Sequence, residues 1–166
     1  MNNYRFISKC IIALLSCIIG LTSCGNDNKI PTNEIHYTTI DNSVLPFNFD
    51  EGRIVSNSYV PDKNVCILKL DKDVTEIENR GFSACSSLKS ITIPPSVTKI
   101  GVDAFSACSN LTSITISKDN KVYDSREDCN AIIHTESNTL IRGCENSIIP
   151  PSVTEIGSSA FSGCSS

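Results

Sequence analysis

A block of about twenty residues recurs along the second half of this chain, and this recurrence restricts the possible folds more than any other feature. The sequence VTEIENRGFSACSSLKSITI at residues 74–93 matches VTKIGVDAFSACSNLTSITI at residues 97–116, an offset of 23 residues. A third copy, VTEIGSSAFSGCSS, begins at Val153, which is 56 residues after Val97. Because 56 equals 23 plus 33, one unit is ten residues longer than the others.

Cutting the chain at the recurring apolar position divides residues 65–166 into four units, or rungs. A period between about 20 and 29 residues with an L-x-x-L-x-L-like core is typical of leucine-rich solenoids, in which each rung buries its apolar edge against its neighbours. We therefore predict an α/β solenoid, a short stack of leucine-rich repeats with one strand and one short helical turn per rung. The predicted rungs are 65–87, 88–110, 111–143 and 144–166.

The order of residue types within one rung predicts its local structure. Ile91 and Ile93 alternate with polar residues, so they point inward from a short strand. The following Pro94 ends the strand because proline cannot donate a hydrogen bond to a ladder. Asp103 can cap a helical turn that brings Phe105 and Cys108 to one face.

Two recurring positions supply the predicted core. We expect the side chains at the first position to stack as a buried aromatic column, and those at the second to form a row of small apolar thiols that point inward side by side. The six residues are Phe82, Phe105, Phe161, Cys85, Cys108 and Cys164. A disulfide remains open as an alternative for exported cysteines, and Cys129 with Cys144 would then be the best pair.

The N-terminal segment has the features of an export signal. Arg5 and Lys9 precede an apolar run at residues 10–20, too short to span a bilayer, so residues 1–23 are predicted to be a signal peptide. The sequence LTSC resembles the bacterial lipoprotein box, which implies that Cys24 is lipidated and becomes the mature N-terminus. Gly25 then favours the outer membrane, with surface exposure. The alternative is an ordinary secreted protein.

The segments between this signal and the repeats have a different composition. Residues 24–45 are polar with little apolar periodicity, which predicts a flexible tether, although IHYTT at residues 35–39 could pair as a short strand. The segments GRIVSNSYV and VCILKL flank the turn PDKN, which predicts a β-hairpin. We assign residues 46–64 to an N-terminal cap hairpin and residues 65–166 to the solenoid.

Charge and residue types argue against several classes of function. The chain has 14 Lys and Arg against 18 Asp and Glu, a net charge of −4 that does not favour nucleic acid. His134 and Cys129 could form a base–nucleophile pair only with an acid to orient the histidine, and the sequence has no acidic residue at a spacing that indicates such a role. Asp124, Glu127 and Asp128 lack the alternation and turn glycine of a calcium loop, which favours a solvated charged loop. We predict no catalytic, cofactor or metal site, and no enzyme.

The outward positions of the predicted strands form the candidate protein-binding face. Solenoids use such continuous faces for binding, although ordinary solvated strand residues have the same composition. A small, flat and nearly neutral face predicts a weak contact that depends on avidity. Its residues are Ile67, Lys69, Ser90, Thr92, Ser113 and Thr115.

The string I-x-I-P-x-x-V-x-x-I-G-x-x-A-F-x-x-C-x-x-L, from Ile91 to Leu111, resembles the 23-residue repeat of BspA-like leucine-rich repeat surface proteins of Bacteroidetes, treponemes and trichomonads. Residues 122–144 resemble an extended repeat of these proteins, and IVSNSYV resembles their N-terminal cap. The resemblance implies a lipid-anchored, non-enzymatic envelope protein that binds a host extracellular-matrix or bacterial surface protein in adhesion and meets the membrane only through its lipid.

The last rung departs from this pattern. Cys144 and Ser147 stand where Leu88 and Ile91 stand in the second rung, which weakens the fourth strand. A solenoid also needs a polar cap over its end. The alternative function is therefore a shortened structural protein, a periplasmic scaffold that associates with itself through the last rung.

Overall fold

The computed structural model describes residues 29–46 and 53–164, and short strands dominate this part of the chain. The predicted signal peptide at residues 1–23 and the predicted lipidation site Cys24 lie outside the described residues. No helix in the described ranges is long and apolar enough to cross a membrane. In chain order the strands are β1 (Glu34–Thr39), β2 (Ile54–Val60), β3 (Val65–Leu70), β4 (Glu76–Ile77), β5 (Leu88–Ile93), β6 (Lys99–Ile100), β7 (Ser113–Ile116), β8 (Tyr123–Asp124), β9 (Ile132–His134), β10 (Thr139–Arg142) and β11 (Glu155–Ile156).

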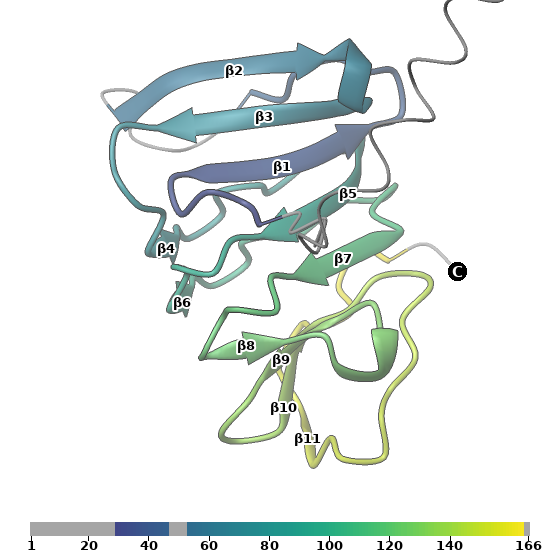
Figure 1. Cartoon of the computed structure of the whole chain (residues 1–166). Helices are drawn as coiled ribbons and strands as arrows, with labels where there is room; N and C mark the ends of the chain where they lie inside the picture. Colours follow the sequence, from purple (N-terminus) through teal and green to yellow (C-terminus); the bar gives the residue numbers. More distant parts are fainter. Residues whose placement is uncertain (1–28, 47–52, 165–166) are drawn as a thin grey trace, which may run out of the picture.

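The largest sheet has five strands in the order β2-β3-β1-β5-β7, which follow one another down Figure 1. β2 and β3 form an antiparallel hairpin, with a turn of 3₁₀ helix at Pro61–Lys63 between them. β5 and β7 are parallel, and Ile91 pairs with Ile114. This pairing joins residues that are 23 positions apart, so the sequence repeat and the sheet register agree.

β1 lies inside this sheet, antiparallel to both β3 and β5. Its side chains alternate, with Ile35, Tyr37 and Thr39 buried and the residues between them partly exposed. The tether predicted for residues 24–45 is therefore wrong for Glu34–Thr39, whereas the short strand considered for residues 35–39 does form. The alternating side chains give this segment an apolar face that the sheet buries. Its position also separates the strands of the first two rungs, which we expected to be neighbours.

Away from the five-stranded sheet, the first two repeat units are direct neighbours, with no strand between them. β4 and β6 are parallel, and Ile77 pairs with Ile100 at the same 23-residue offset. Backbone hydrogen bonds continue this stacking, since the amide of Phe82 donates to the carbonyl of Ala104 and that of Ala84 to Ser106, both at 2.8 Å. A third sheet, in the order β11-β10-β9-β8, is built from the long third unit and the start of the last repeat copy.

The predicted helical turn does not form. Residues 101–108 are turns without α-helix, and Asp103, the expected helix cap, has a φ of 54°. Two positions of each repeat copy have left-handed backbone (positive φ), which is incompatible with a continuous right-handed α-helix. They are Arg80, Asp103 and Ser159 at the first position, and Ala84, Ala107 and Gly163 at the second. The hydrogen bonds between rungs replace those that a helix would have made within one rung.

The fourth predicted rung also lacks its strand, since residues 143–150 contain only turn and irregular backbone. The hydroxyl of Ser147 accepts a hydrogen bond from the amide of Cys144 at 2.8 Å and donates one to the carbonyl of Asn130 at 2.6 Å. The polar side chain of Ser147, at the inward position, thus stabilises a local turn, and no strand forms there.

The core consists of two clusters. Phe82 and Phe105 belong to the larger cluster, whereas Phe161 is only partly buried and packs on the smaller one. The expected aromatic column of three rings therefore contains two stacked rings, and the third lies against Gly143. Phe161 therefore packs in a different cluster from the other two phenylalanines.

All six described cysteines have free thiols, including Cys129 and Cys144. Cys85 and Cys108 are buried in the larger cluster, and Cys164 is partly exposed. The thiol of Cys108 donates to the carbonyl of Phe82 at 3.0 Å, so the thiol row also joins neighbouring units.

Candidate functional site

The structure places all six residues of the candidate protein-binding face on one sheet. Each occupies a non-buried position between inward-facing residues of β3, β5 or β7. Thr92 pairs with Thr115, and Ser90 pairs with Ser113, so these four lie close together. Ile67 and Lys69 lie beyond β1 and do not adjoin the other four.

The outward side chains of β1 complete this face. His36 pairs with Ile67 on one side and with Thr92 on the other. The hydroxyls of Thr38 and Ser90 are 2.6 Å apart, and Glu34 lies 3.0 Å from the His36 ring and 3.7 Å from the Lys69 ammonium. The face is therefore more polar than the repeat sequence predicts, with a carboxylate, an imidazole and hydroxyls joined by hydrogen bonds.

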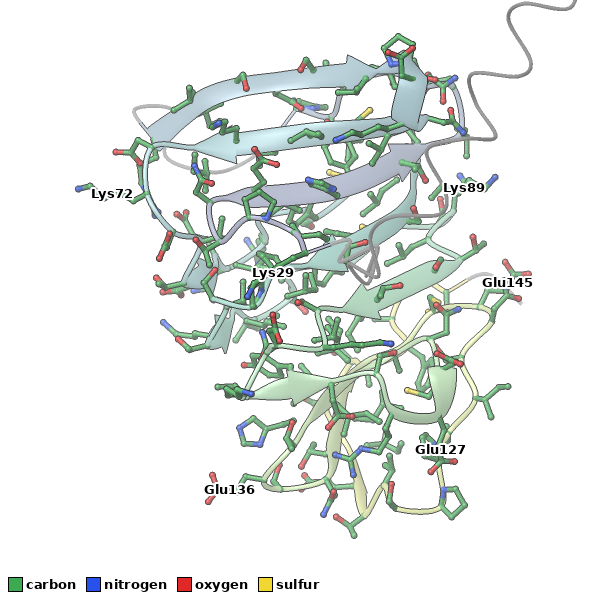
Figure 2. The ribbon with its side chains drawn as sticks, in the orientation of Figure 1. Lys29, Lys72, Lys89, Glu127, Glu136 and Glu145 are labelled. Carbon is green, nitrogen blue, oxygen red and sulfur yellow. The ribbon has the colours of Figure 1, made fainter. Side chains whose placement is uncertain are left out.

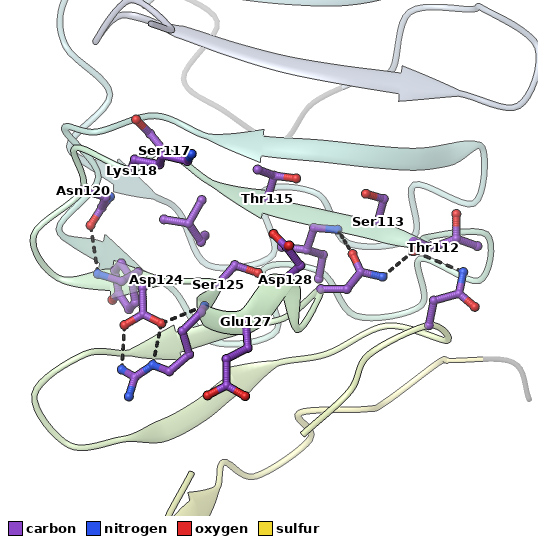
Figure 3. A pocket seen from close by; sticks show the side chains of 16 residues that line it. Thr112, Ser113, Thr115, Ser117, Lys118, Asn120, Asp124, Ser125, Glu127 and Asp128 are labelled. Atoms are coloured by element: carbon purple, nitrogen blue, oxygen red, sulfur yellow. Dashed lines mark hydrogen bonds and ion pairs between the residues drawn. The ribbon is translucent and has the colours of Figure 1, made fainter. Parts of the chain in front are cut away.

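A groove of about 720 Å³ lies beside β7, which is the last strand of its sheet. One wall is residues 112–118 and the other is the loop of the long third unit at residues 124–130. Figure 3 shows Asp128 directed toward β7 and Glu127 directed away from it. Sequence reasoning missed this groove, because it depends on how the ten extra residues fold back beside β7.

Asn130 connects the two walls of the groove. Its side-chain oxygen accepts from the Ile114 amide at 2.6 Å, and its side-chain nitrogen donates to the Thr112 carbonyl at 2.7 Å. The carboxamide therefore pairs with β7 in the way that a peptide group of a neighbouring strand would. Its backbone φ of 57° is one that asparagine tolerates better than most residues.

A second asparagine fixes the start of the same loop. Asn120 is buried and donates to the carbonyls of Pro94 and Val97 at 3.0 and 2.9 Å. Its oxygen accepts from the amides of Val122 and Tyr123 at 2.9 and 2.8 Å. Nothing in the sequence distinguishes Asn120 and Asn130 from the asparagines of exposed turns.

The Arg126 guanidinium donates two parallel hydrogen bonds to the Asp124 carboxylate, from Nε at 2.8 Å and from Nη2 at 2.6 Å. Burial pushes the pKa of Asp124 up, but hydrogen bonds from Arg126 and Thr135 outweigh it, and the pKa lies below its ordinary value. Arg126 also donates to the side chain of Asn138 at 2.8 Å, which ties the loop to the β9–β10 turn. The Asp124–Arg126 pair therefore stabilises the conformation of the loop that forms one wall of the groove.

The remaining charges at the groove are solvated. Lys118, Glu127 and Asp128 are exposed. Within the described ranges, no three His, Cys, Asp or Glu side chains come close enough together to hold a metal ion. The groove therefore offers hydrogen-bonding groups and separate charges, a composition suited to a polar polypeptide surface.

The structure also locates the two residues considered for nucleophilic chemistry. Cys129 is fully buried, and its thiol lies 3.7 Å from the Ser125 hydroxyl. His134 is partly exposed on β9, packs edge-on against Tyr123 and lies 3.0 Å from the Ser137 hydroxyl. No hydrogen bond joins Cys129 to His134 in the part of the chain that the structure describes.

Comparison with known proteins agrees with the repeat geometry. The family described as the BspA type leucine rich repeat region matches residues 28–135 and 132–166, in six copies. A leucine-rich cell surface protein from Faecalibacterium prausnitzii A2-165, known from a crystal structure, is 31% identical with a TM-score of 0.42, over 55% of this chain and 31% of that one. No curated protein matches. The chain, whose repeats match over most of its length, belongs to the BspA-type leucine-rich repeat family.

Proposed function

We propose that this chain is a non-catalytic protein-binding domain of the cell surface, which engages a protein ligand with the outer face of β5 and β7 and the adjoining groove. Membership of a leucine-rich repeat family supports this proposal, since such domains generally bind proteins and are typically non-catalytic. The Faecalibacterium relative, a cell surface protein by its description, supports the location.

The observation that carries the proposal is the position of Thr115. It is an exposed side chain of β7 that belongs to the sheet face and also lines the groove. Face and groove therefore form one surface, which is polar, mostly uncharged and built on the regular strands of two successive repeats. A surface of this composition favours a contact of modest affinity that several copies would strengthen.

The test is binding of the purified full chain to a panel of purified extracellular-matrix proteins and to intact neighbouring bacteria. Thr115→Arg places a bulky charge where face and groove meet, and we expect it to reduce binding at least about tenfold, the equivalent of about 1.4 kcal/mol. Lys72→Glu is the control for a charge change elsewhere on the surface, because Lys72 is exposed in the loop after β3, away from β7 (Figure 2). Equal losses in both variants would argue against this surface.

We also propose the finer location inferred from the sequence, a lipid on Cys24 that holds the protein at the outer membrane, facing outward, in an adhesive role. Two or more acyl chains are needed for firm anchoring. Cells grown with radiolabelled palmitate should label the parent protein and not Cys24→Ala. Protease treatment of intact cells should remove the protein, whereas a chain that faces the periplasm would resist.

One observation supports the alternative, a self-associating periplasmic scaffold. The last repeat exposes three large apolar side chains, Ile148 at 70%, Ile149 at 51% and Ile156 at 46%. Exposed apolar residues that lie together can mark a protein contact. Light scattering decides between the two functions: concentration-dependent growth in mass that Ile148→Ser with Ile149→Ser abolishes would support the scaffold, and a monomer at high concentration would contradict it.

A further inference from the structure

The outer edge of β7 carries backbone groups that pair with no strand of the described chain. The inner edge is bonded to β5, and β7 is the last strand of the five-stranded sheet. The next repeat supplies no strand at this place, because residues 143–150 form turns and irregular backbone. A sheet edge of this kind can take up one more extended chain through main-chain hydrogen bonds.

Two hydrogen bonds establish which backbone groups of β7 point outward. The Ile114 amide donates to the Asn130 side chain, on the side away from β5. The Ser117 amide donates to the Ile93 carbonyl of β5 at 2.9 Å. Successive residues of a strand direct their amides and carbonyls to opposite edges, so those of Ile116, like those of Ile114, point outward. Among the described residues, nothing bonds to the Ile114 carbonyl or to the amide and carbonyl of Ile116.

These unpaired groups lie at the groove beside β7. Ile114 and Ile116 both line the groove although their side chains are buried, at 2% and 6% exposure, so the groove meets these residues at the backbone. The volume of about 720 Å³ lies in the range of pockets that hold ligands. The Asn130 carboxamide already pairs with β7 at the Thr112 end as a peptide group would. Pairing of the same kind can continue along Ile116.

We propose that the groove binds one extended segment of a ligand protein as an added strand on β7, with a lysine or arginine of that segment beside Asp128. The inference rests on the proposed function and states which kind of contact its groove makes. Asp128 is exposed and directed toward β7 (Figure 3), so its carboxylate favours a basic side chain there. Arg126 does not neutralise it, because that guanidinium is bonded to Asp124.

The opposite wall of the groove argues against a second copy of this chain as the occupant. A paired strand lies only about 4.8 Å from its neighbour, and residues 124–130 lie on the far side of that space. A second β7 would arrive with its own sheet and its own copy of this loop, which would collide with the wall. A single extended segment has no such attachments.

Charge argues against the chain's own N-terminal segment. Lys29 pairs with Asp119 at 3.1 Å, so the described chain begins close to the end of β7. The residues before it, 25–28, contain one acid, Asp27, and no base. They therefore offer no basic partner to the Asp128 carboxylate.

The experiment uses the purified full chain and short synthetic peptides of alternating threonine and valine with lysine at the centre. Methyl groups on alternate backbone nitrogens leave such a peptide one pairing edge and prevent its self-association, whereas methyl groups on every nitrogen leave it none. Only the one-edged peptide should bind. At saturation we expect hydrogen exchange at the Ile116 amide to slow at least about tenfold. Exchange at the Thr115 amide, which faces β5, should not change.

Asp128→Asn tests the charge. Asparagine tolerates the φ of 51° at this position, so the variant keeps the loop and loses only the carboxylate. The parent should bind the lysine peptide about three- to fivefold more tightly than its glutamine counterpart at low salt, and Asp128→Asn should bind both alike. Glu136→Gln is the matched control, because Glu136 is exposed in the β9–β10 turn and does not line the groove. It should keep the preference.

Slower exchange at Ile116 together with loss of the lysine preference in Asp128→Asn supports the proposal. Unchanged exchange at Ile116, equal binding of the fully methylated peptide, or a lysine preference that survives in Asp128→Asn overturns it. Protection of the Ile116 amide without any peptide overturns it as well. Protection that disappears on dilution would identify a second copy as the occupant, and protection at every concentration would identify the chain itself.

These outcomes differ from those that test the proposed function. If Thr115→Arg reduces binding to a matrix protein while the peptides leave Ile116 unprotected, the face binds its ligand without an added strand. If the peptides protect Ile116 while no protein or bacterium of the panel binds the parent, the strand pairing stands and the proposed function fails.

Discussion

The rings of Phe82 and Phe105 stack with their centroids 5.3 Å apart and their planes inclined by 12°. Both side chains are buried, at 0% and 2% exposure, and they occupy the same position in successive repeats. The amide of Phe82 donates to the carbonyl of Ala104, next to Phe105, at 2.8 Å. Ring and backbone contacts thus hold the same two units in register.

Phe105→Ala should lower the free energy of unfolding by about 3–5 kcal/mol, because it removes a buried ring and leaves a cavity against Phe82. Phe161→Ala should cost distinctly less, since Phe161 is only partly buried at the edge of the smaller cluster. Chemical denaturation of both variants checks the difference. Equal costs would show that all three rings are equivalent, as the repeat sequence alone predicts.

The second left-handed position of the repeats yields a pair of opposite predictions. Ala107 is exposed with a φ of 56°, so Ala107→Gly should stabilise the protein by about 0.5–1 kcal/mol by relieving backbone strain. Gly163 occupies the equivalent position with a φ of 77°, and an added Cβ would lie 2.9 Å from the Ala107 backbone. Gly163→Ala should therefore cost about 1 kcal/mol or more. Thermal melts of the two variants should shift in opposite directions.

Asn130→Ala should expose the edge of β7. The change removes both hydrogen bonds to Ile114 and Thr112, and we expect a loss of about 1–3 kcal/mol. Hydrogen exchange at the Ile114 amide should accelerate more than exchange at the Ile91 amide. Asn110→Ala is the control, because Asn110 is exposed and makes one side-chain bond, to the Ser86 carbonyl. Unchanged exchange at Ile114 would contradict the bracing role.

Alkaline pH should destabilise the protein through Cys108. Burial raises the pKa of this thiol from an ordinary 9.0 to about 12. Between these values the unfolded state loses the proton and the folded state keeps it, so stability falls as pH rises, by up to about 1.4 kcal/mol per pH unit. Denaturant unfolding at several pH values between 8 and 11 should show a shallower decline for Cys108→Ala than for the parent. Parallel curves would refute the assignment.

Much of the repeat core could be predicted from local patterns. Ile91, Ile93, Ile114 and Ile116 alternate with polar residues, and alternation determines which side of a strand is buried whatever its neighbours are. The 23-residue offset likewise predicted the pairing of β5 with β7. The face residues Ser90, Thr92, Ser113 and Thr115 follow from the same period of two.

The sequence by itself therefore determined the repeat unit, its inward residues and its family. Tertiary structure alone decided three things: the position of β1 between the first two rungs, the left-handed turns where a helix was expected, and the groove beside β7. Each depends on hydrogen bonds between residues far apart in the chain, such as Thr38 with Ser90 or Asn130 with Ile114. Local propensity carries no information about such partners, and only packing of the whole chain selects them.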